Sequence, residues 1–171
     1  MNHQISDKAE LPKPPIISIS SLQDLKTQTH DLFLSATRTI QIYTHGLDPR
    51  ILNNRDMEKV LTKFIKKSRS SQLQILIYDE HLLRGIDHRL VALAQRFTSY
   101  VQIRMVPRDY HENLFGFYLV DDRRMLHRTN FERYEAERMA MPHFLIREKS
   151  KLFNTIWQAS PPASFLRALN L

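Results

Sequence analysis

The chain has 171 residues, of which 42% are hydrophobic and 25% charged, and it contains no cysteine. This length suits one domain with a tail, and the composition is ordinary for a globular protein. The absence of cysteine excludes a disulfide framework, thiol catalysis and cysteine-ligated zinc. Lys and Arg outnumber Asp and Glu by 25 to 18, a formal net charge of +7, and this balance favours phosphate-bearing partners.

Several other classes are excluded by pattern. No apolar run approaches the length of about 18 residues that a membrane span needs, so no membrane partner is expected. The first 15 residues have neither the apolar core nor the end of a signal peptide, and a cytoplasmic protein is the default expectation. The eight histidines form no HxH, HxxxH or HExxH pattern, and the three glycines form no phosphate loop, so we predict no metal and no cofactor.

In the N-terminal part, residues 1–15 are polar and Pro-rich, which predicts a disordered arm, and 16–19 is a candidate edge strand. The tetrapeptide SLQD has the form of a capping box, and apolar residues then recur at helical spacing, so a helix is predicted over 21–37. The next segment, 39–44, reads as a strand.

The clearest helix of the chain is capped by Asn54, and its apolar residues follow the i, i+3, i+4, i+7 pattern. Its opposite face carries a run of cations: Lys59, Lys63, Lys66, Lys67 and Arg69. Such a run is usually a solvated face. The alternative is a basic stripe that meets phosphates.

Two further strands, 72–79 and 101–106, enclose a third helix predicted over 83–97, and a last helix ends before Ser160. Residues 16–160 thus form a single α/β domain, and 161–171 a C-terminal tail that packs on it. The regular alternation of strands and helices predicts a layered, mixed and largely parallel sheet flanked by helices. Ligands of such sheets bind beyond the carboxyl ends of the strands.

The segment 113–133, NLFGFYLVDDRRMLHRTNFER, reads as strand, tight turn, strand and polar loop. This order resembles the active-site hairpin of the phospholipase D-like superfamily, so the resemblance implies one half of that fold. Catalytic members carry His-x-Lys and, four residues later, Asp, followed by a Gly-Ser-x-Asn-like loop. Histidine is their nucleophile and lysine binds the phosphate. Two such motifs usually meet at a dimer-like interface, so the resemblance also allows a homodimer.

This chain lacks the two motif residues that carry out the chemistry, the histidine and the lysine. With Asp121 in the place of the motif's Asp, the lysine position holds Gly116 and the histidine position holds Leu114. The loop that follows has Arg128 where Gly is expected, and Thr129 and Asn130 near the Ser and Asn places. Covalent phosphoryl transfer has no agent at these positions, so we assign no catalytic residue.

A closer resemblance covers most of residues 38 to 171. The runs DHRLVALAQRF, VQIRMVP, HRTNFERYEAER and IWQASPPASFLRAL look like an uncharacterised domain of gammaproteobacterial proteins. That domain sometimes follows a GNAT acetyltransferase domain, but this chain has no GNAT-like coenzyme A loop. Its recurring features correspond here to Asp79, His88 with Arg89, Arg104, Arg128, and Arg133 with Glu135.

The predicted ligand site unites an arginine cluster. His88, Arg89, Arg128 and Arg133, with Asn130 beside them, would surround an anion, because arginine forks bind phosphate and carboxylate well. The alternative is a surface cluster in which Arg89 pairs with a carboxylate such as Asp79. Structural ion pairing is the role expected for Asp79, Arg104 and Glu135. Arg104, inside a predicted strand, is either an edge residue or a buried ion-pair partner, and if buried it needs a carboxylate.

Three functional hypotheses follow. The first is a non-catalytic phospholipase D-like domain, a pseudoenzyme, that binds nucleic acid or another phosphate-bearing ligand through this site. The second is a protein-interaction or regulatory module that works with an acetyltransferase supplied by a separate protein partner. The third is a phosphodiesterase with an atypical nucleophile, for which His111 is a displaced candidate.

Overall fold

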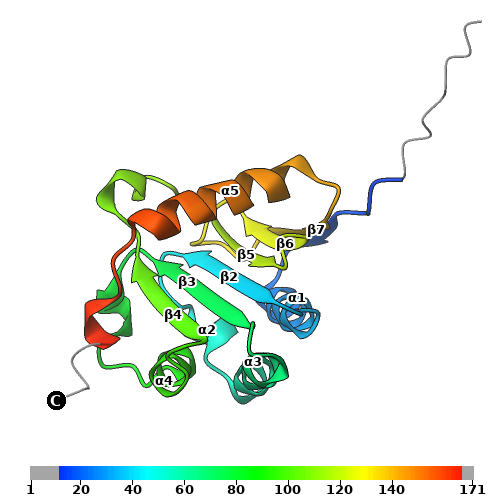
Figure 1. The fold of residues 1–171 in the computed structure, drawn as a ribbon. Coiled ribbons are helices and arrows are strands. Elements are labelled where there is room, and N and C mark those ends of the chain that lie inside the picture. Colours follow the sequence, from blue (N-terminus) through cyan, green and yellow to red (C-terminus); the bar gives the residue numbers. More distant parts are fainter. Residues whose placement is uncertain (1–11, 167–171) are drawn as a thin grey trace, which may run out of the picture.

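The computed structural model describes residues 12–166, which form one mixed sheet with helices on both faces (Figure 1). The strands are β1 (Ile17–Ile19), β2 (Thr39–Thr44), β3 (Gln72–Ile77), β4 (Val101–Met105), β5 (Gly116–Val120), β6 (Arg124–Arg128) and β7 (Ala136–Ala140). The helices are α1 (Leu22–Leu34), α2 (Pro49–Leu52), α3 (Arg55–Lys67), α4 (Arg89–Arg96) and α5 (Phe144–Ala159).

The prediction of a largely parallel sheet is wrong. The seven strands lie in the order β1-β7-β6-β5-β2-β3-β4, and only β2-β3 and β3-β4 are parallel pairs. The strands from β5 to β7 are joined by short connections, which force antiparallel neighbours. They also add beside β2 rather than beyond β4, so the hairpin lies in the middle of the sheet.

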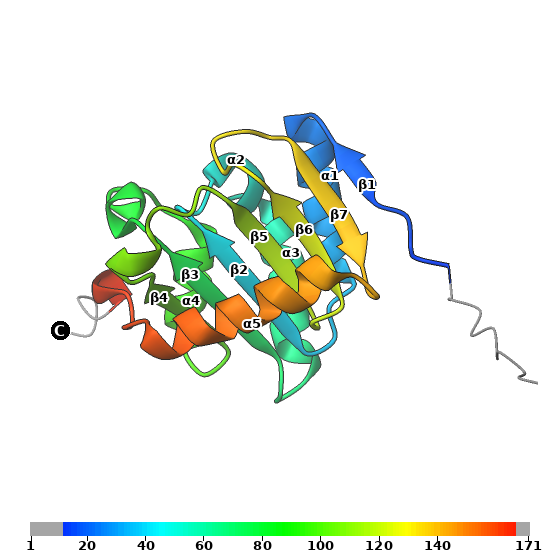
Figure 2. The same ribbon diagram turned by 90° about the horizontal axis from the view of Figure 1, so that it is seen from above.

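The helices form two layers around the sheet. α1, α3 and α4 cover one face and α5 crosses the other alone (Figures 1 and 2). A core cluster fills each interface. α3 shows why these elements form: the Asn54 side chain accepts a hydrogen bond from the Met57 amide at 2.9 Å, and the apolar stripe of the helix is fully buried.

Two other elements differ from prediction. The third helix begins at Arg89, because Glu80–Leu83 forms a separate 3-10 turn and Gly85 takes a left-handed φ of 74°. Ile86, which lies inside the predicted helix, is outside α4 and 44% exposed. The strand β7 was missed because its sequence, AERMA, lacks apolar alternation.

The described chain ends lie along the two edges of the sheet. β1 pairs with β7, which agrees with the candidate edge strand, and the part of the predicted arm before residue 12 lies outside the described residues. At the other edge, the Met105 amide donates to the Pro161 carbonyl and the Ala163 amide to the Ile103 carbonyl. Between residues 12 and 166, no helix has the length and apolarity that a membrane crossing requires.

Candidate functional site

The turn of the β5-β6 hairpin is fixed by Asp121, which stands where the resembled motif has its Asp. Its carboxylate accepts hydrogen bonds from the amides of Thr37, Arg38 and Thr39 at 2.8 to 2.9 Å and from the Thr37 hydroxyl. Burial raises the pKa of Asp121, but these bonds lower it more, so that it lies below its ordinary value. Asp121 therefore ties the hairpin to the start of β2.

The motif's histidine and lysine positions are not equipped for catalysis. Leu114 is 56% exposed, and its carbonyl accepts a hydrogen bond from the Phe131 amide at 2.8 Å. At Gly116, a Cβ atom would stand 3.1 Å from the Tyr43 carbonyl oxygen and 3.9 Å from the Phe131 Cβ. A longer side chain at this position would have to displace its neighbours.

Arg128 lies opposite Gly116 in the hairpin and is 4% exposed. Its guanidinium donates to the carbonyl oxygens of Phe131 and Arg133 and so shapes the loop after β6. In the same loop the Asn130 side chain accepts from the Glu132 amide at 2.9 Å. The Arg133 side chain is exposed. Two of these three predicted ligand residues therefore already hold the loop, and Arg133 faces solvent.

His88 and Arg89, the other two residues of the predicted site, also have partners within the protein. His88 is 2% exposed rather than on the polar side of the helix, and its Nδ1 accepts from the Leu90 amide as the cap of α4. Burial lowers the pKa of His88. Arg89 forms an ion pair with Glu58, and not with Asp79, while its amide donates to the Asn53 side chain.

One hollow, at the carboxyl end of β2, is bordered by Arg128 and by the segment before His88, and we call it the carboxyl-edge cleft; the other predicted ligand residues do not line it. Its volume is about 470 Å³. One wall comes from the loop after β6 and the other from the segment that leads to His88. The lining comprises Thr44, His45, Gly46, Leu47, Asp48, Pro49, Arg50, Leu82, Ile86, Arg128, Phe131 and Glu132. The structure thus brings the two predicted segments together without bringing their charged groups together.

The chemistry of the carboxyl-edge cleft is aromatic and apolar with a polar rim. The rings of His45 and Phe131 stack at 4.4 Å between centroids and 2° between planes. Leu82 is 48% exposed. The guanidinium of Arg50 is held by two hydrogen bonds to Asp48 at 3.0 Å. Such a lining suits a planar ring with polar edges better than a bare phosphate.

A buried polar cluster lies behind this cleft and was not predicted. The Tyr78 hydroxyl donates to the Tyr43 hydroxyl, which also accepts from the Asn113 amide at 3.2 Å. Burial raises the pKa of both phenols, and the bond to Tyr43 raises that of Tyr78 further. Both are therefore neutral near pH 7. His111 stacks on Tyr78 and its Nε2 lies 2.9 Å from the Val106 carbonyl oxygen, so its ring is held structurally.

A second buried pair, Lys149 of α5 and His127 of β6, lies on the same face of the sheet, where Phe115 packs against both Tyr43 and Lys149. Lys149 is 6% exposed, and its Nζ lies 3.7 Å from the centre of the Phe115 ring. Burial, and then the charge of Lys149, lower the pKa of His127 to about 4. Helical spacing from Ile146 to Phe153 places Lys149 on the apolar face of α5, a signal that the sequence does contain. Neither side chain lines the carboxyl-edge cleft.

The residues expected to form structural ion pairs find other partners. The Asp79 side chain accepts from the His81 amide at 2.8 Å. Arg104 donates to the Trp157 carbonyl at 2.9 Å and lies 4.2 Å above the indole ring. In the part of the chain that the structure describes, neither these two nor Glu135 has a carboxylate or cationic partner within ion-pair distance.

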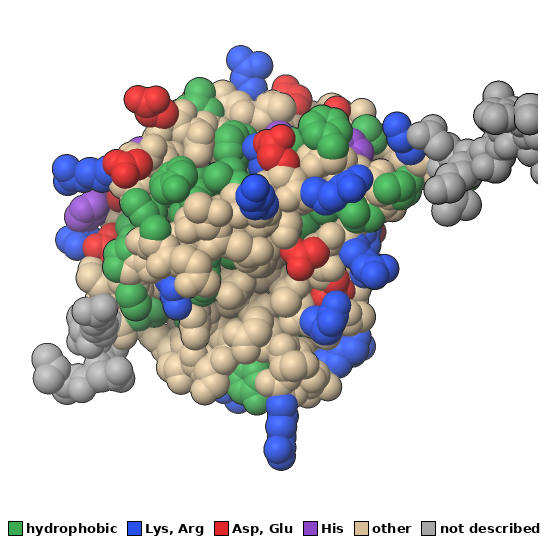
Figure 3. Space-filling view, turned by 45° about the horizontal axis from the view of Figure 1, so that its top comes forward, with side chains coloured by type: hydrophobic (Ala, Val, Ile, Leu, Met, Phe, Trp, Pro, Cys, Tyr) green, Lys and Arg blue, Asp and Glu red, His purple; other side chains and the backbone are tan. Residues whose placement is uncertain are grey.

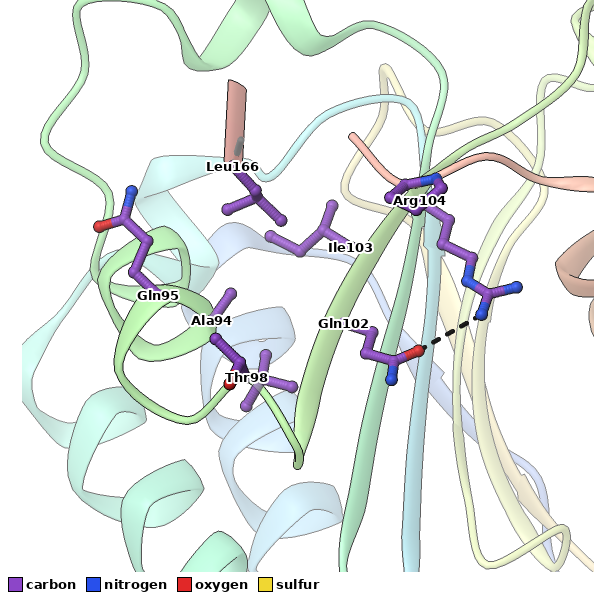
Figure 4. Close-up of a pocket in the computed structure, with 9 residues that line it drawn as sticks. Ala94, Gln95, Thr98, Gln102, Ile103, Arg104 and Leu166 are labelled. Atoms are coloured by element: carbon purple, nitrogen blue, oxygen red, sulfur yellow. Dashed lines mark hydrogen bonds between the residues drawn. The ribbon is translucent and has the colours of Figure 1, made fainter. Parts of the chain in front are cut away.

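Beside Arg104 lies a larger hollow of about 550 Å³, between α4 and the edge strand β4 (Figure 4). Gln95, Thr98 and Gln102 line it, and the Arg104 guanidinium leans away toward Gln102 (Figure 4). Two strands, β2 and β3, separate this hollow from the hairpin, so the candidate site is not placed there. Within residues 12–166, no three His, Asp or Glu side chains are grouped as metal ligands.

Comparison with known proteins gives the family and the fold. The chain matches the domain of unknown function DUF7931 over residues 21–169, and it belongs to that family. No curated protein matches it in sequence. Among solved structures, Nuc from Salmonella typhimurium, a phospholipase D family member, is 16% identical with a TM-score of 0.57, covering 88% of this chain and 99% of its own. NucT from Helicobacter pylori is 9% identical with a TM-score of 0.59, covering 87% and 100%.

TrmBL2, an archaeal chromatin protein described as having a novel mode of DNA binding, is 15% identical with a TM-score of 0.62. The match covers 92% of this chain and 57% of TrmBL2, so the chain spans little more than half of that protein. At these identities the likeness concerns the fold alone. The chain therefore has a phospholipase D-like fold, as the hairpin predicted, and the DUF7931 family is itself of unknown function.

Proposed function

We propose that this member of the DUF7931 family is a non-catalytic phospholipase D-like domain that binds nucleic acid, with a base held in the carboxyl-edge cleft. The observation that carries the proposal is the His45–Phe131 stack in the lining of the carboxyl-edge cleft. The nearby hairpin has Leu114 and Gly116 in place of the motif's histidine and lysine. Aromatic rings of this kind are the usual platforms for unpaired bases.

Loss of catalysis is supported by the state of the histidines. A nucleophilic histidine must reach phosphorus with a free ring nitrogen. His111 is held by a backbone carbonyl, and His88 and His127 are buried away from the cleft surface. The carboxyl-edge cleft has one histidine in its lining, His45.

Nucleic acid is favoured over a small phosphate compound for two reasons. The net charge of +7 attracts polyanions. In the cleft, Arg50 already pairs with Asp48 and Arg128 with backbone carbonyls, so neither guanidinium is free to bind a lone phosphate. TrmBL2, with the same fold, is described as binding DNA.

The test is fluorescence anisotropy with a labelled single-stranded oligonucleotide. Phe131→Ala should weaken binding about 5- to 150-fold, because one stacked base contributes about 1–3 kcal/mol. The variant keeps the Phe131 backbone, whose amide and carbonyl hold Leu114 and Arg128. Phe144→Ala is the matched control, since Phe144 is 70% exposed at the start of α5.

Equal affinity of Phe131→Ala and wild type would contradict the proposal, as would an absence of binding at low salt. The phosphodiesterase alternative has one specific observation in its favour, the place of His45 in the cleft. It predicts hydrolysis of a chromogenic phosphodiester that His45→Ala abolishes. Our proposal predicts no hydrolysis by either protein.

A further inference from the structure

The cations around the carboxyl-edge cleft are mostly neutralised by nearby groups. Arg50 pairs with Asp48, Arg84 with Glu80 and Arg89 with Glu58. Arg128 is bound to backbone carbonyls. A surface that uses the net positive charge to bind a partner must therefore lie outside this cleft.

The opposite end of the parallel strands is basic without such neutralisation. We call this surface the basic edge and define it as Arg38, Lys63, Lys66, Lys67, Arg69 and Arg96. All six side chains are exposed, and none is in an ion pair within residues 12–166. Between Glu58 and Asp79 the sequence contains no acidic residue.

The basic edge is assembled from several elements. Arg38 immediately precedes β2, whose first residue pairs with that of β3. The Lys67 Nζ lies 3.4 Å from the Ala36 carbonyl oxygen, which joins the end of α3 to the approach to β2. Arg96 lies over the Phe97 ring at 5.0 Å. Two helices, α3 and α4, and the loops that lead into β2 and β3 thus contribute to one surface.

Two grooves run through the basic edge and share Lys66 and Lys67. One, of about 460 Å³, lies between α1 and α3 and is also lined by Lys63. The other, of about 350 Å³, lies between the end of α3 and the approach to β4 and has aromatic residues in its lining, Phe97 and Tyr100. The lysines therefore border concave surfaces rather than a convex one.

Helix stability does not account for this pattern. Lysines in the last turn of a helix complement its dipole, and this explains Lys66 and Lys67. It does not explain Lys63, which lies a turn earlier, or the arginines that come from other elements.

We propose that the basic edge binds the phosphate backbone of nucleic acid, at a site separate from the carboxyl-edge cleft. This inference rests on the proposed function and assigns its electrostatic part to the amino ends of the strands. A nucleic-acid partner fits better than a membrane surface, because a membrane-binding face also needs apolar area. In the two grooves, Leu34 is the one large apolar side chain more than about a third exposed.

The experiment compares two double variants that lose the same charge. Lys63→Gln/Lys67→Gln alters the basic edge, and Arg147→Gln/Lys151→Gln alters exposed α5 residues at the same helical spacing. The α5 side, tilted forward in Figure 3, carries Lys and Arg at separate points with Asp and Glu between them. Glutamine preserves helix propensity in both cases.

Oligonucleotide affinity is measured against salt concentration. The basic-edge variant should bind more weakly at low salt, and the slope of log K against log salt should fall in magnitude by about 1.4 for a single strand or about 1.8 for a duplex, while the α5 variant keeps the wild-type slope. Equal losses in both variants would overturn the inference, because bulk charge alone would then explain binding.

The same proteins separate this inference from the proposed function. If Phe131→Ala weakens binding and the basic-edge variant does not, the inference fails and the cleft stands. If the basic-edge variant loses binding to vesicles of phosphatidylserine and phosphatidylcholine but keeps oligonucleotide binding, the surface serves a membrane and the inference fails. The result expected is weaker oligonucleotide binding by Phe131→Ala and by the basic-edge variant, with a change of salt slope in the basic-edge variant alone.

Discussion

Asp121→Asn should destabilise the fold strongly although it removes no apolar contact. The carboxylate accepts four hydrogen bonds, two on each oxygen, from the segment Thr37–Thr39. Asparagine keeps one oxygen and turns an NH₂ group toward the other two donors. Hydrogen bonds to a charged group contribute roughly 1.5–3 kcal/mol each, so the expected loss is about 3 kcal/mol of unfolding free energy. For a chain of this size that corresponds to a fall in Tm of about 6–12 °C.

Asp122→Asn is the matched control. Asp122 is the next residue of the turn, also has a positive φ, and is exposed, with one hydrogen bond from the Ser150 hydroxyl at 2.7 Å. Asparagine tolerates a positive φ as well as aspartate does, so both variants preserve the turn. Urea unfolding at pH 7 should separate them, with a loss below about 1 kcal/mol for Asp122→Asn.

The pH dependence adds an independent check. Because the pKa of folded Asp121 is lowered, its stabilising effect is present above the pKa of an unfolded Asp, about 3.9, and is lost as pH falls through the lower folded value. The gap between wild type and Asp121→Asn should therefore narrow in strong acid. Equal stability of the two variants at pH 7 would refute the role assigned to the carboxylate.

Two further outcomes concern the hairpin. Gly116→Ala should lower the free energy of unfolding by about 1–3 kcal/mol, because the added Cβ would meet the Tyr43 carbonyl oxygen. The double variant Leu114→His/Gly116→Lys, which restores the motif's residue types, should gain no hydrolysis of a chromogenic phosphodiester. His127→Leu should flatten the stability profile in mild acid. The pKa of folded His127 is about 4, so its neutral form stabilises the fold fully above the unfolded value near 6.5, and this effect is lost as pH falls toward 4. An unchanged slope between pH 4 and 6.5 would contradict the burial of a neutral imidazole.

The sequence was informative where one local rule governs an element. Ser21 caps α1 as predicted, since its hydroxyl accepts a hydrogen bond from the Asp24 amide at 3.1 Å, and the α3 stripe is buried as its periodicity required. Sheet direction was mispredicted because alternation of helix and strand covers only three of the strands. Nothing local indicates that β5 pairs with β2.

The sequence indicated a region for the candidate site but not which side chains line it. The carboxyl-end rule and the hairpin both indicate the end of the sheet where the carboxyl-edge cleft lies. Which cations are free depends on neighbours distant in sequence, such as Glu58 for Arg89, and on a loop that folds back on Arg128. The Tyr43–Asn113 contact could not be predicted for the same reason, because its two residues are 70 positions apart in the sequence.

The most direct test of the account is the affinity of the wild-type chain for a labelled single-stranded oligonucleotide as a function of salt. We expect binding at low salt that weakens linearly on a plot of log K against log salt, as phosphate contacts require. An absence of binding at low salt would contradict a nucleic-acid function and direct attention to a protein partner.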